Sequence, residues 1–433
     1  MSNLINKKVA FYTLGCKLNF SETSTIARNL VNNGLSKVDF SDNADLYVIN
    51  TCAVTREAEK KCRKVVRRIL RRSPDAFVAV IGCYSQLNPI EIANISGVDI
   101  VLGNSEKFNI LDYLNNLDKN AKAQIYSCDT LEMKSFIPSF SKGERTRTFL
   151  KIQDGCDYNC SYCTIPKARG QSRSDSIQNT VRLAQEIAKT DVKEIVLTGV
   201  NIGDFGRRTG ETFFDLIQRL DNIEGIERIR ISSIEPNLLT NEIIDFVQCS
   251  EKFVSHFHIP LQSGSNKILK LMHRRYSREM FSNRVEKIKS VLPDCCIGVD
   301  VMVGFPGETE EEFTETYNFI NNLDISYLHV FTYSERKYIK GVDDDARDPV
   351  KTCSQRSKIL HSLSEEKRKE FNNQFLGKIV PVLFENHQNG WLTGLTENYI
   401  RTLVPAHTSL INSIFEVKLI DHNGKYLKGE LIN

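Results

Sequence analysis

Three cysteines in one short segment have the type and spacing to bind a metal cluster. Cys156, Cys160 and Cys163 form a C-x3-C-x2-C pattern directly after a predicted strand, 148–153. Three thiolates spaced this closely can each bind one iron of a [4Fe–4S] cluster, which leaves the fourth iron open to an added ligand. A structural zinc site would normally have four ligands, and no fourth lies nearby. A zinc knuckle or an incidental cysteine-rich loop remains the alternative.

A second set of cysteines is dispersed along the chain but occurs in one repeated setting. Cys16, Cys52 and Cys83 each come directly after a predicted strand. Because the carboxyl ends of parallel strands meet at one edge of a sheet, the three sulfurs can converge there and bind a second cluster. Each of them alone is more often a buried structural cysteine. We interpret the remaining six as structural or incidental: Cys62, Cys128, Cys249, Cys295, Cys296 and Cys353.

The elements that carry the second cysteine set alternate between strand and helix. Short apolar strands and longer helical patterns follow one another over residues 7–115, which predicts a doubly wound parallel sheet. A polar stretch, 118–145, is predicted to be a linker with room for one extra strand. The expected strands are 9–14, 46–50, 77–81 and 100–102, and the expected helices are 21–33 and 58–72.

The alternation then restarts and continues for six strand–helix units. This number predicts an open, partial (β/α)6 barrel, in which the carboxyl ends of the strands form the functional face. The expected strands are 148–153, 194–200, 228–233, 256–261, 298–303 and 327–333, and the helices include 180–189, 212–220, 278–291 and 310–322.

After Gln374 the pattern changes to short alternating runs separated by turn pairs such as Asn389-Gly390 and Asn423-Gly424. Such runs predict a small antiparallel β-barrel. The runs are 379–385, 391–396, 399–404 and 414–420. The fold class is therefore α/β with a parallel-sheet domain, a central partial barrel and a terminal antiparallel barrel.

Composition limits the class of protein. The chain has 433 residues, 41% hydrophobic and 26% charged, with a formal net charge of +3 and 12 cysteines. No apolar run approaches the roughly 18–20 residues of a membrane span, and Lys7 and Lys8 lead into a strand and not into a signal peptide. We therefore expect a cytoplasmic protein, in which cysteines bind metal and do not form a disulfide framework.

Basic residues are concentrated in the helical stretch after Cys52. The same stretch has only two acidic residues, Glu57 and Glu59, so the basic residues form a candidate surface for RNA phosphates. The alternative is that they form a solvated face, which is more common for a run of charges. The predicted contacts are Arg63, Lys64, Arg67, Arg68 and Arg71. The C-terminal segment has five basic and five acidic residues, so charge does not mark it as RNA-binding. Trp391, Tyr399 and Phe384 are either stacking groups there or core residues.

Together these motifs resemble the radical S-adenosylmethionine (SAM) methylthiotransferase family over nearly the whole chain. The resemblance rests on the two cysteine sets, on a terminal barrel similar to a TRAM domain, and on several family-like stretches: 15–19 (GCKLN), 50–55 (NTCAVT), 165–170 (IPKARG), 258–264 (HIPLQSG) and 300–308 (DVMVGFPGE). One departure follows the last barrel strand, where 333–340 (YSERKYIK) replaces the Pro-Gly-Thr type of turn that is usual in the family.

The resemblance implies an activity. The stretches at Cys16 and Cys52 are most similar to the bacterial branch that adds a methylthio group to C2 of N6-threonylcarbamoyladenosine, next to the anticodon of tRNA. The isopentenyladenosine branch usually has Gln-Met where this chain has Lys17 and Leu18. That branch and the branch that modifies a ribosomal protein remain alternatives, as does a non-catalytic metal-binding RNA scaffold.

The resemblance also implies cofactors, partners and boundaries. Two [4Fe–4S] clusters would be bound, one by Cys16, Cys52 and Cys83 and one, with SAM, by the C-x3-C-x2-C set. Implied partners are the tRNA anticodon loop and an electron donor such as flavodoxin or ferredoxin, and the expected state is a monomer. The domains would be 1–124, 142–372 and 374–433. Implied SAM contacts are Tyr162, Thr198, Gly199, Ser233, Glu235, Gln262 and Asp300.

The substrate group adds one expectation. A threonylcarbamoyl group carries a carboxylate, so a pocket that is specific for it should contain a cation. Arg169 and Arg173, just after the radical cysteines, are the residues that we predict for this role. They could equally bind the carboxylate of SAM or an RNA phosphate.

Overall fold

The computed structural model describes residues 4–53, 56–114, 117, 119, 122–143, 146–335, 349–405, 408–422 and 424–432. It forms two compact units, which are described separately. Unit 1 comprises Met1–Lys142, Phe149–Tyr158 and Cys163–Ser174, and unit 2 comprises Gly143–Thr148, Asn159–Tyr162 and Asp175–Asn433. None of the helices in these ranges is long and apolar enough to cross a membrane.

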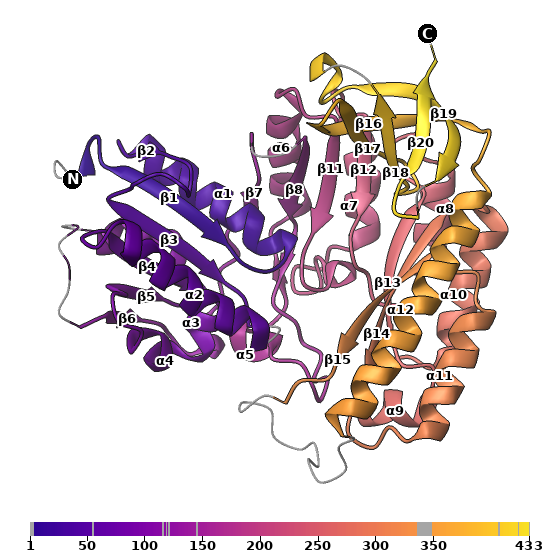
Figure 1. The fold of residues 1–433 in the computed structure, drawn as a ribbon, viewed down its shortest axis with the longest axis horizontal. Coiled ribbons are helices and arrows are strands. Elements are labelled where there is room, and N and C mark those ends of the chain that lie inside the picture. The colour runs from indigo at the N-terminus through magenta and orange to yellow at the C-terminus, as the bar shows by residue number, and fades with distance from the viewer. Residues whose placement is uncertain are drawn as a thin grey trace. The chain divides into compact units, whose positions relative to one another are not determined.

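Unit 1 is built on a six-stranded parallel sheet of order β2-β1-β3-β4-β5-β6 (Figure 1). The four predicted strands are confirmed. The sequence did not predict β2, which has only two residues. The linker was expected to have room for one extra strand, and its described residues hold two, β6 in this sheet and the two-residue β7 (Ser139–Phe140). The strands are β1 (Lys8–Thr13), β2 (Ser36–Lys37), β3 (Leu46–Thr51), β4 (Phe77–Gly82), β5 (Ile100–Leu102) and β6 (Gln124–Tyr126).

Both faces of this sheet are covered, as a doubly wound fold requires. Side chains alternate between faces along a strand, and those of β3 and β4 divide between two separate hydrophobic clusters, with Tyr47 and Val78 in one and Val48 and Ala79 in the other. Helix α2 (Arg56–Arg72) packs in the first cluster and α1 (Lys17–Asn32) in the second. The shorter helices are α3 (Cys83–Leu87), α4 (Pro89–Ala93) and η2 (Lys107–Tyr113).

The barrel segment begins with β8 (Arg147–Lys151), which pairs antiparallel with β7 (Ser139–Phe140). In unit 2, β11 pairs in parallel with β12, β13 pairs in parallel with β14, and β14 with β15, while a bridge from Ser233 to His258 joins the two groups. These strands are β11 (Glu194–Thr198), β12 (Arg228–Ile231), β13 (His256–Gln262), β14 (Cys296–Val303) and β15 (Tyr327–Thr332). The six predicted strands are confirmed.

Helices connect the barrel strands in the expected alternation. They are α6 (Ile177–Ala188), α7 (Phe213–Asp221), α8 (Asn241–Cys249), α9 (Asn266–Leu271), α10 (Arg278–Val291) and α11 (Glu310–Asn322), followed by the long α12 (Val350–Asn373). Most begin at a Ser or Thr whose hydroxyl caps the first turn; Ser176, Thr212 and Ser277 are examples.

The C-terminal segment is a closed five-stranded barrel of order β16-β17-β18-β20-β19. The structure corrects the prediction in two respects: a fifth strand is present, and β18 and β20 pair in parallel, so that the barrel is not purely antiparallel. The turn at Asn389-Gly390 is confirmed by positive φ angles at both residues, whereas Asn423 lies outside the described residues. The strands are β16 (Ile379–Gln388), β17 (Trp391–Thr396), β18 (Arg401–Pro405), β19 (Ile414–His422) and β20 (Leu427–Leu431).

Buried arginines of β12 connect this barrel to the rest of unit 2. Arg228 donates to the carbonyl oxygens of Leu395 (3.2 Å) and Pro381 (3.0 Å). Arg230 donates to the carbonyl of Glu397 (2.7 Å) and to the carboxylate of Glu194 (2.8 and 3.1 Å). Both arginines are almost inaccessible to solvent, so Glu194 supplies a negative charge that a buried guanidinium needs.

We expect Glu194→Gln to lower the free energy of unfolding by roughly 3–5 kcal/mol, because it leaves Arg230 buried without its charged partner. Burial alone would raise the pKa of Glu194, but Arg230 and Arg147 lower it to about 2. Since the folded pKa lies below the ordinary value of 4.5, this stabilisation is complete above about pH 4.5 and is lost as the pH falls towards 2. Urea unfolding at several pH values measures both effects.

Glu227→Gln is the matched control for this experiment. Glu227 pairs with Lys193 at 2.8 Å, but both side chains are partly exposed, and such pairs contribute at most about 1 kcal/mol. Equal losses in the two variants would contradict the importance assigned to the buried pair.

Candidate functional site

The three dispersed cysteines lie at one edge of the unit 1 sheet. Cys52 directly follows β3, Cys83 directly follows β4, and Cys16 lies just beyond the end of β1. These strands are adjacent in the sheet, and Leu14 continues the pairing through a bond from its N–H to the carbonyl of Asn50 (2.8 Å). Cys52 and Cys83 are buried, whereas Cys16 is exposed. The thiols therefore converge on an edge that is open to solvent at Cys16.

Glycines precede two of these cysteines and allow the close approach. Gly15 and Gly82 have φ angles of +108° and +99°, which favour glycine. A Cβ atom on Gly15 would lie 2.7 Å from Cβ and 3.0 Å from Sγ of Cys52, and one on Gly82 would lie 2.3 Å from Asn50. The backbone is thus shaped around the thiols. This donor set fits an iron–sulfur cluster, which cysteine thiolates bind.

The C-x3-C-x2-C cysteines occupy the loop between β9 (Gln153–Asp154) and α5 (Ile165–Arg169). The loop begins at Gly155, where φ is +70° and a Cβ atom would lie 2.0 Å from the carbonyl oxygen of Gln171. The N–H of Cys156 donates to the carbonyl of Gly170 (3.0 Å), and the N–H of Tyr158 points at Sγ of Cys156 (3.4 Å). An N–H directed at the sulfur suits a thiolate, so this donor set also fits a cluster.

Arg274, which the sequence did not indicate, organises the unit 2 part of this loop. Its Nη1 lies 3.2 Å from Sγ of Cys160 and 3.3 Å from the hydroxyl of Tyr162, and its Nη2 pairs with the carboxylate of Glu235. Its guanidinium lies over the ring of Tyr276, 4.9 Å from the centroid. Burial raises the pKa of the Cys160 thiol, and the Arg274 cation beside the sulfur opposes that rise by favouring the thiolate. The only sequence signal was the pair Arg274-Arg275 just after α9.

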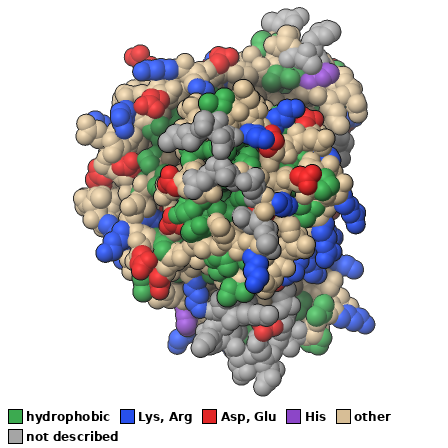
Figure 2. All heavy atoms as spheres, turned by 90° about the vertical axis from the view of Figure 1, so that its left-hand side faces the viewer, with side chains coloured by type: hydrophobic (Ala, Val, Ile, Leu, Met, Phe, Trp, Pro, Cys, Tyr) green, Lys and Arg blue, Asp and Glu red, His purple; other side chains and the backbone are tan. Residues whose placement is uncertain are grey.

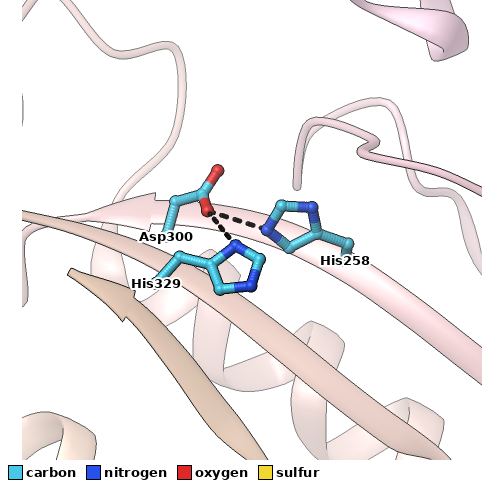
Figure 3. Close-up of side chains that lie close together, drawn as sticks. All are labelled: His258, Asp300 and His329. Carbon is cyan, nitrogen blue, oxygen red and sulfur yellow. Dashed lines mark hydrogen bonds and ion pairs between the residues drawn. The ribbon is translucent and has the colours of Figure 1, made fainter. Parts of the chain in front are cut away.

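Asp300 forms a polar cluster with two histidines that the sequence had not indicated as site residues. Its Oδ1 lies 2.8 Å from Nε2 of His258 and 3.4 Å from Nδ1 of His329, as Figure 3 shows. Burial would raise the pKa of Asp300, but the two histidines lower it below its ordinary value. Asp300 is therefore an ionised hydrogen-bond acceptor. The histidines come from the neighbouring strands β13 and β15, so the parallel register brings them together.

The other residues predicted to contact SAM lie at or beyond the carboxyl ends of strands. Thr198 is the last residue of β11, and Gly199 follows it. The buried hydroxyl of Thr198 donates to the carbonyl of Val196 (3.2 Å). Ser233 forms the bridge to His258. Gln262 ends β13 with a φ of +68°, and it is buried.

The ring of Tyr162 packs edge-on against that of Phe305, with 6.4 Å between the centroids. Tyr162 therefore packs against a neighbouring side chain of unit 2.

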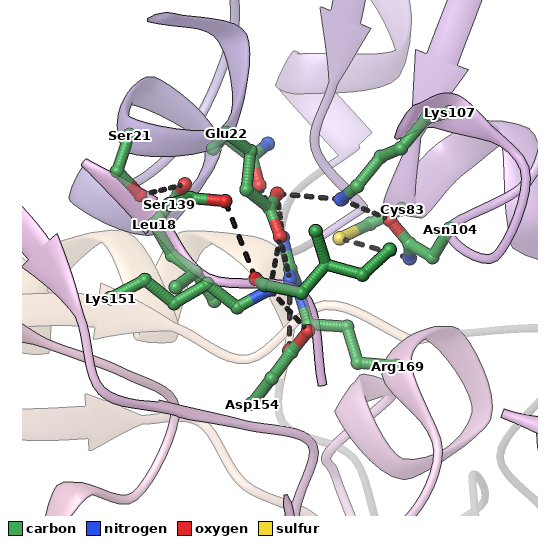
Figure 4. A network of polar contacts seen from close by, with 12 residues as sticks. Leu18, Ser21, Glu22, Cys83, Asn104, Lys107, Ser139, Lys151, Asp154 and Arg169 are labelled. Atoms are coloured by element: carbon green, nitrogen blue, oxygen red, sulfur yellow. Dashed lines mark hydrogen bonds and ion pairs between the residues drawn. The ribbon is translucent and has the colours of Figure 1, made fainter. Parts of the chain in front are cut away.

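The two arginines predicted to bind the substrate carboxylate bind other protein groups in unit 1. Arg169 is 1% exposed, and its guanidinium contacts Glu22, Asp154 and Asn19 at 2.6–3.0 Å, partly drawn in Figure 4. The structure thus favours a structural role for Arg169. Arg173 donates to Asp154 (3.1 Å) and to carbonyl oxygens, and it lines a cavity of about 240 Å³.

Helix α2 presents its basic residues opposite a buried face that includes Cys62, Val66 and Ile69. Lys64, Arg67 and Arg71 are exposed, and the structure shows no ion pair or hydrogen bond for their side chains within its described ranges. Arg63 instead pairs with Glu91, and Arg68 lies over the ring of Phe40, 4.8 Å from the centroid. Figure 2 shows Lys and Arg side chains gathered at the right-hand edge of the face it presents.

The aromatic residues of the C-terminal barrel have different environments. Phe384 is fully buried and belongs to the core, which decides against stacking on RNA, whereas Trp391 is 38% exposed. Tyr399 stacks on His256 within unit 2, with ring centroids 4.4 Å apart.

Comparison with protein families identifies two segments. Residues 150–320 match the Radical SAM superfamily, and residues 8–103 match Uncharacterized protein family UPF0004. Among solved structures, the radical SAM methyltransferase TsrM from Kitasatospora setae superposes with a TM-score of 0.56 at 12% identity, over 75% of this chain and 73% of that one. This likeness supports the fold alone.

Full-length relatives give a finer assignment. Threonylcarbamoyladenosine tRNA methylthiotransferase MtaB of Bacillus subtilis (strain 168) is 40% identical over 98% of this chain and 96% of its own length. A tRNA-2-methylthio-N(6)-dimethylallyladenosine synthase of Clostridium tetani is 31% identical over 98% and 97%. The chain therefore belongs to the radical SAM methylthiotransferase family, in its threonylcarbamoyladenosine tRNA branch.

Proposed function

We propose that this protein adds a methylthio group to C2 of N6-threonylcarbamoyladenosine, next to the anticodon of tRNA, giving 2-methylthio-N6-threonylcarbamoyladenosine. The observation that carries the proposal is the position of Cys16, Cys52 and Cys83 at the ends of three adjacent strands. A radical SAM enzyme that only cleaved SAM would not need this second thiol set. In a methylthiotransferase, these cysteines would bind a second cluster that provides the sulfur to be inserted.

The residues of the chain divide between two cofactor sites. Cys156, Cys160 and Cys163 would hold one [4Fe–4S] cluster with SAM, and the dispersed cysteines would hold the other. When bound, these groups supply radical hydrogen abstraction and the sulfur to be inserted, which no amino-acid side chain can provide. Arg274 would stabilise the Cys160 thiolate and hold Glu235 and Tyr162 in position.

SAM contacts are assigned to the barrel segment, and the substrate contact is assigned to unit 1. The residues proposed for SAM are Tyr162, Thr198, Gly199, Ser233, Glu235, Gln262 and Asp300, and Arg173 is retained as the residue proposed for the substrate carboxylate. We propose the domain limits 1–124, 142–372 and 374–433, although β6 ends at Tyr126, two residues past the first limit.

Partners follow from the same assignment. The exposed Lys64, Arg67 and Arg71 of α2 would bind tRNA phosphates, helped by Arg63 and Arg68 at its partly paired positions. A small electron carrier such as flavodoxin or ferredoxin would reduce the radical cluster, and the protein would act as a cytoplasmic monomer. The dimethylallyladenosine activity is less favoured, because the relative with that name is 31% identical and the threonylcarbamoyladenosine enzyme 40%.

Anaerobic reconstitution with iron and sulfide tests the proposal. We expect Cys16/Cys52/Cys83→Ala to bind about half the iron of the wild type. The variant should still cleave SAM but form no methylthio product on tRNA. Metal analysis, chromatography of 5′-deoxyadenosine and mass spectrometry of digested tRNA give the three measurements.

Cys62→Ala is a suitable control, because Cys62 is buried in the same unit but lies within helix α2 and not at the end of a strand. It should bind as much iron as the wild type. If the triple variant also does, or if the metal is zinc, the protein is a binding scaffold and the proposal fails.

A further inference from the structure

A network of charged side chains is buried in unit 1, and Figure 4 shows it together with Cys83. Cys83 is one of the three dispersed cysteines, Cys16, Cys52 and Cys83, which we call the auxiliary cysteines. Arg169 lies 3.0 Å from the Glu22 carboxylate and 2.9 Å from that of Asp154. Lys151 bridges the same two carboxylates at 3.0 and 2.9 Å, and Lys107 contacts Glu22 at 2.6 Å. The buried charge network, as we call it, consists of Glu22, Lys107, Lys151, Asp154 and Arg169, and no side chain in it is more than 5% exposed.

Three cations of the network contact two carboxylates, and Arg173, at its margin, is a fourth cation that contacts Asp154 at 3.1 Å. Burial would raise the pKa of both acids, but the neighbouring cations hold the pKa of Glu22 and Asp154 below the ordinary range. Burial lowers the pKa of Lys107 to about 8, and the Glu22 carboxylate 2.6 Å away favours its charged form. The excess positive charge is costly inside a protein unless a negative group lies beside it.

One contact leads from the network to Cys16 and Cys52. Nη2 of Arg169 donates to the side-chain oxygen of Asn19 (2.6 Å), which lies 4.0 Å from Sγ of Cys16. The amide nitrogen of Asn19 donates to the carbonyl of Leu14 (2.8 Å), the residue after β1, and to that of Thr51 (2.9 Å), the last residue of β3. Arg169 thereby fixes the backbone just before both cysteines.

A second contact leads to Cys83. Nζ of Lys107 donates to the side-chain oxygen of Asn104 (2.8 Å), and the amide nitrogen of Asn104 lies 3.7 Å from Sγ of Cys83. The same nitrogen donates to the carbonyl of Ala168 (2.7 Å), directly before Arg169. Lys107 therefore both adds positive charge near the thiols and orients an N–H donor towards one of them.

We propose that the buried charge network raises the reduction potential of the cluster bound by Cys16, Cys52 and Cys83, with Lys107 as a positioning residue that acts through Asn104. Net charge and hydrogen bonds to the sulfurs are two of the properties by which a protein adjusts such a potential. The inference rests on the proposed function, because it requires the second cluster. It also accounts for the excess of cations, since the thiolates supply the missing negative charge.

The test isolates the auxiliary cluster in the full-length chain. Cys156/Cys160/Cys163→Ala serves as the background, so that one cluster remains, and its reduction at pH 7 is followed by electron paramagnetic resonance at defined potentials. We expect Lys107→Met to shift the midpoint to a more negative value at unchanged iron content. Lys107→Arg, which restores the charge, should return it towards the background value.

Lys119→Met is the matched control. Lys119 belongs to the same unit but bonds Asp99 (2.7 Å) and the carbonyl of Ala76 (2.8 Å), which lie at the starts of strands and not at the cysteine edge. Its removal should leave the midpoint unchanged. An equal midpoint in the Lys107→Met variant and the background would overturn the inference.

If Lys107→Met binds less iron than the background, its midpoint cannot be compared with that of the background, and a second variant tests the inference. Asn104→Ser keeps the charges but removes the N–H that faces Cys83. A more negative midpoint then supports the inference, and an unmoved one overturns it. A background protein that binds no iron at all would refute the proposed function and the inference with it.

Discussion

Replacing Cys156, Cys160 and Cys163 by alanine should abolish both the reductive cleavage of SAM and the methylthiolation of tRNA. These cysteines are the only candidate ligands in the loop that opens the barrel segment, and no other side chain can provide radical chemistry. We expect the loss to reach the detection limit of a 5′-deoxyadenosine assay. The iron content should fall only to about half, because the auxiliary cysteines remain.

Cys249→Ala is the control for general effects of cysteine replacement. Cys249 is exposed at the end of α8, and nothing in the proposal involves it. This variant should match the wild type in SAM cleavage. Formation of 5′-deoxyadenosine by the triple variant would show that the radical site lies elsewhere.

The second large effect concerns tRNA affinity. We expect Lys64/Arg67/Arg71→Ser to weaken tRNA binding by about two orders of magnitude near physiological salt, because each phosphate contact that is lost removes counterion release. The slope of log K against log salt should also fall by about one unit for each contact. Filter binding or fluorescence anisotropy over a series of salt concentrations gives both numbers.

The variant Arg63→Ser tests whether a basic residue that is already paired with an acidic side chain contributes less to tRNA binding than an unpaired one. Because Arg63 is engaged with Glu91, its removal should change the salt slope less than the removal of Arg67. If the triple variant keeps wild-type affinity and slope, the helix is a solvated face and tRNA binds through another surface.

The sequence predicted that Cys16, Cys52 and Cys83 lie at one edge of the sheet, because each observation behind that prediction involves residues that are close together in the sequence. Strand alternation, a glycine before Cys16 and Cys83, and the position of each cysteine after a strand can all be recognised within a few residues. The topology of parallel strands then brings such residues together without further information. The same holds for the six barrel strands.

Pairings between distant side chains could not be predicted in this way. Arg169 was expected to face a substrate, but its partner Glu22 lies in a helix that the sequence did not connect with it. Arg274 and the histidines around Asp300 were missed because their partners are set by strand register and loop packing. The parallel pair β18 and β20 was missed because barrel closure depends on all five strands together.

The buried arginines of β12 have a mechanical consequence for substrate selection. Arg228 and Arg230 bind backbone carbonyls of the C-terminal barrel. These bonds restrict the movement of the barrel relative to the strands of unit 2. RNA held on it would stay at a set distance from the ends of β11 to β15. If the barrel binds tRNA, these contacts would fix the distance between the bound part of the tRNA and the base at the strand ends, and that distance would limit which tRNAs can react.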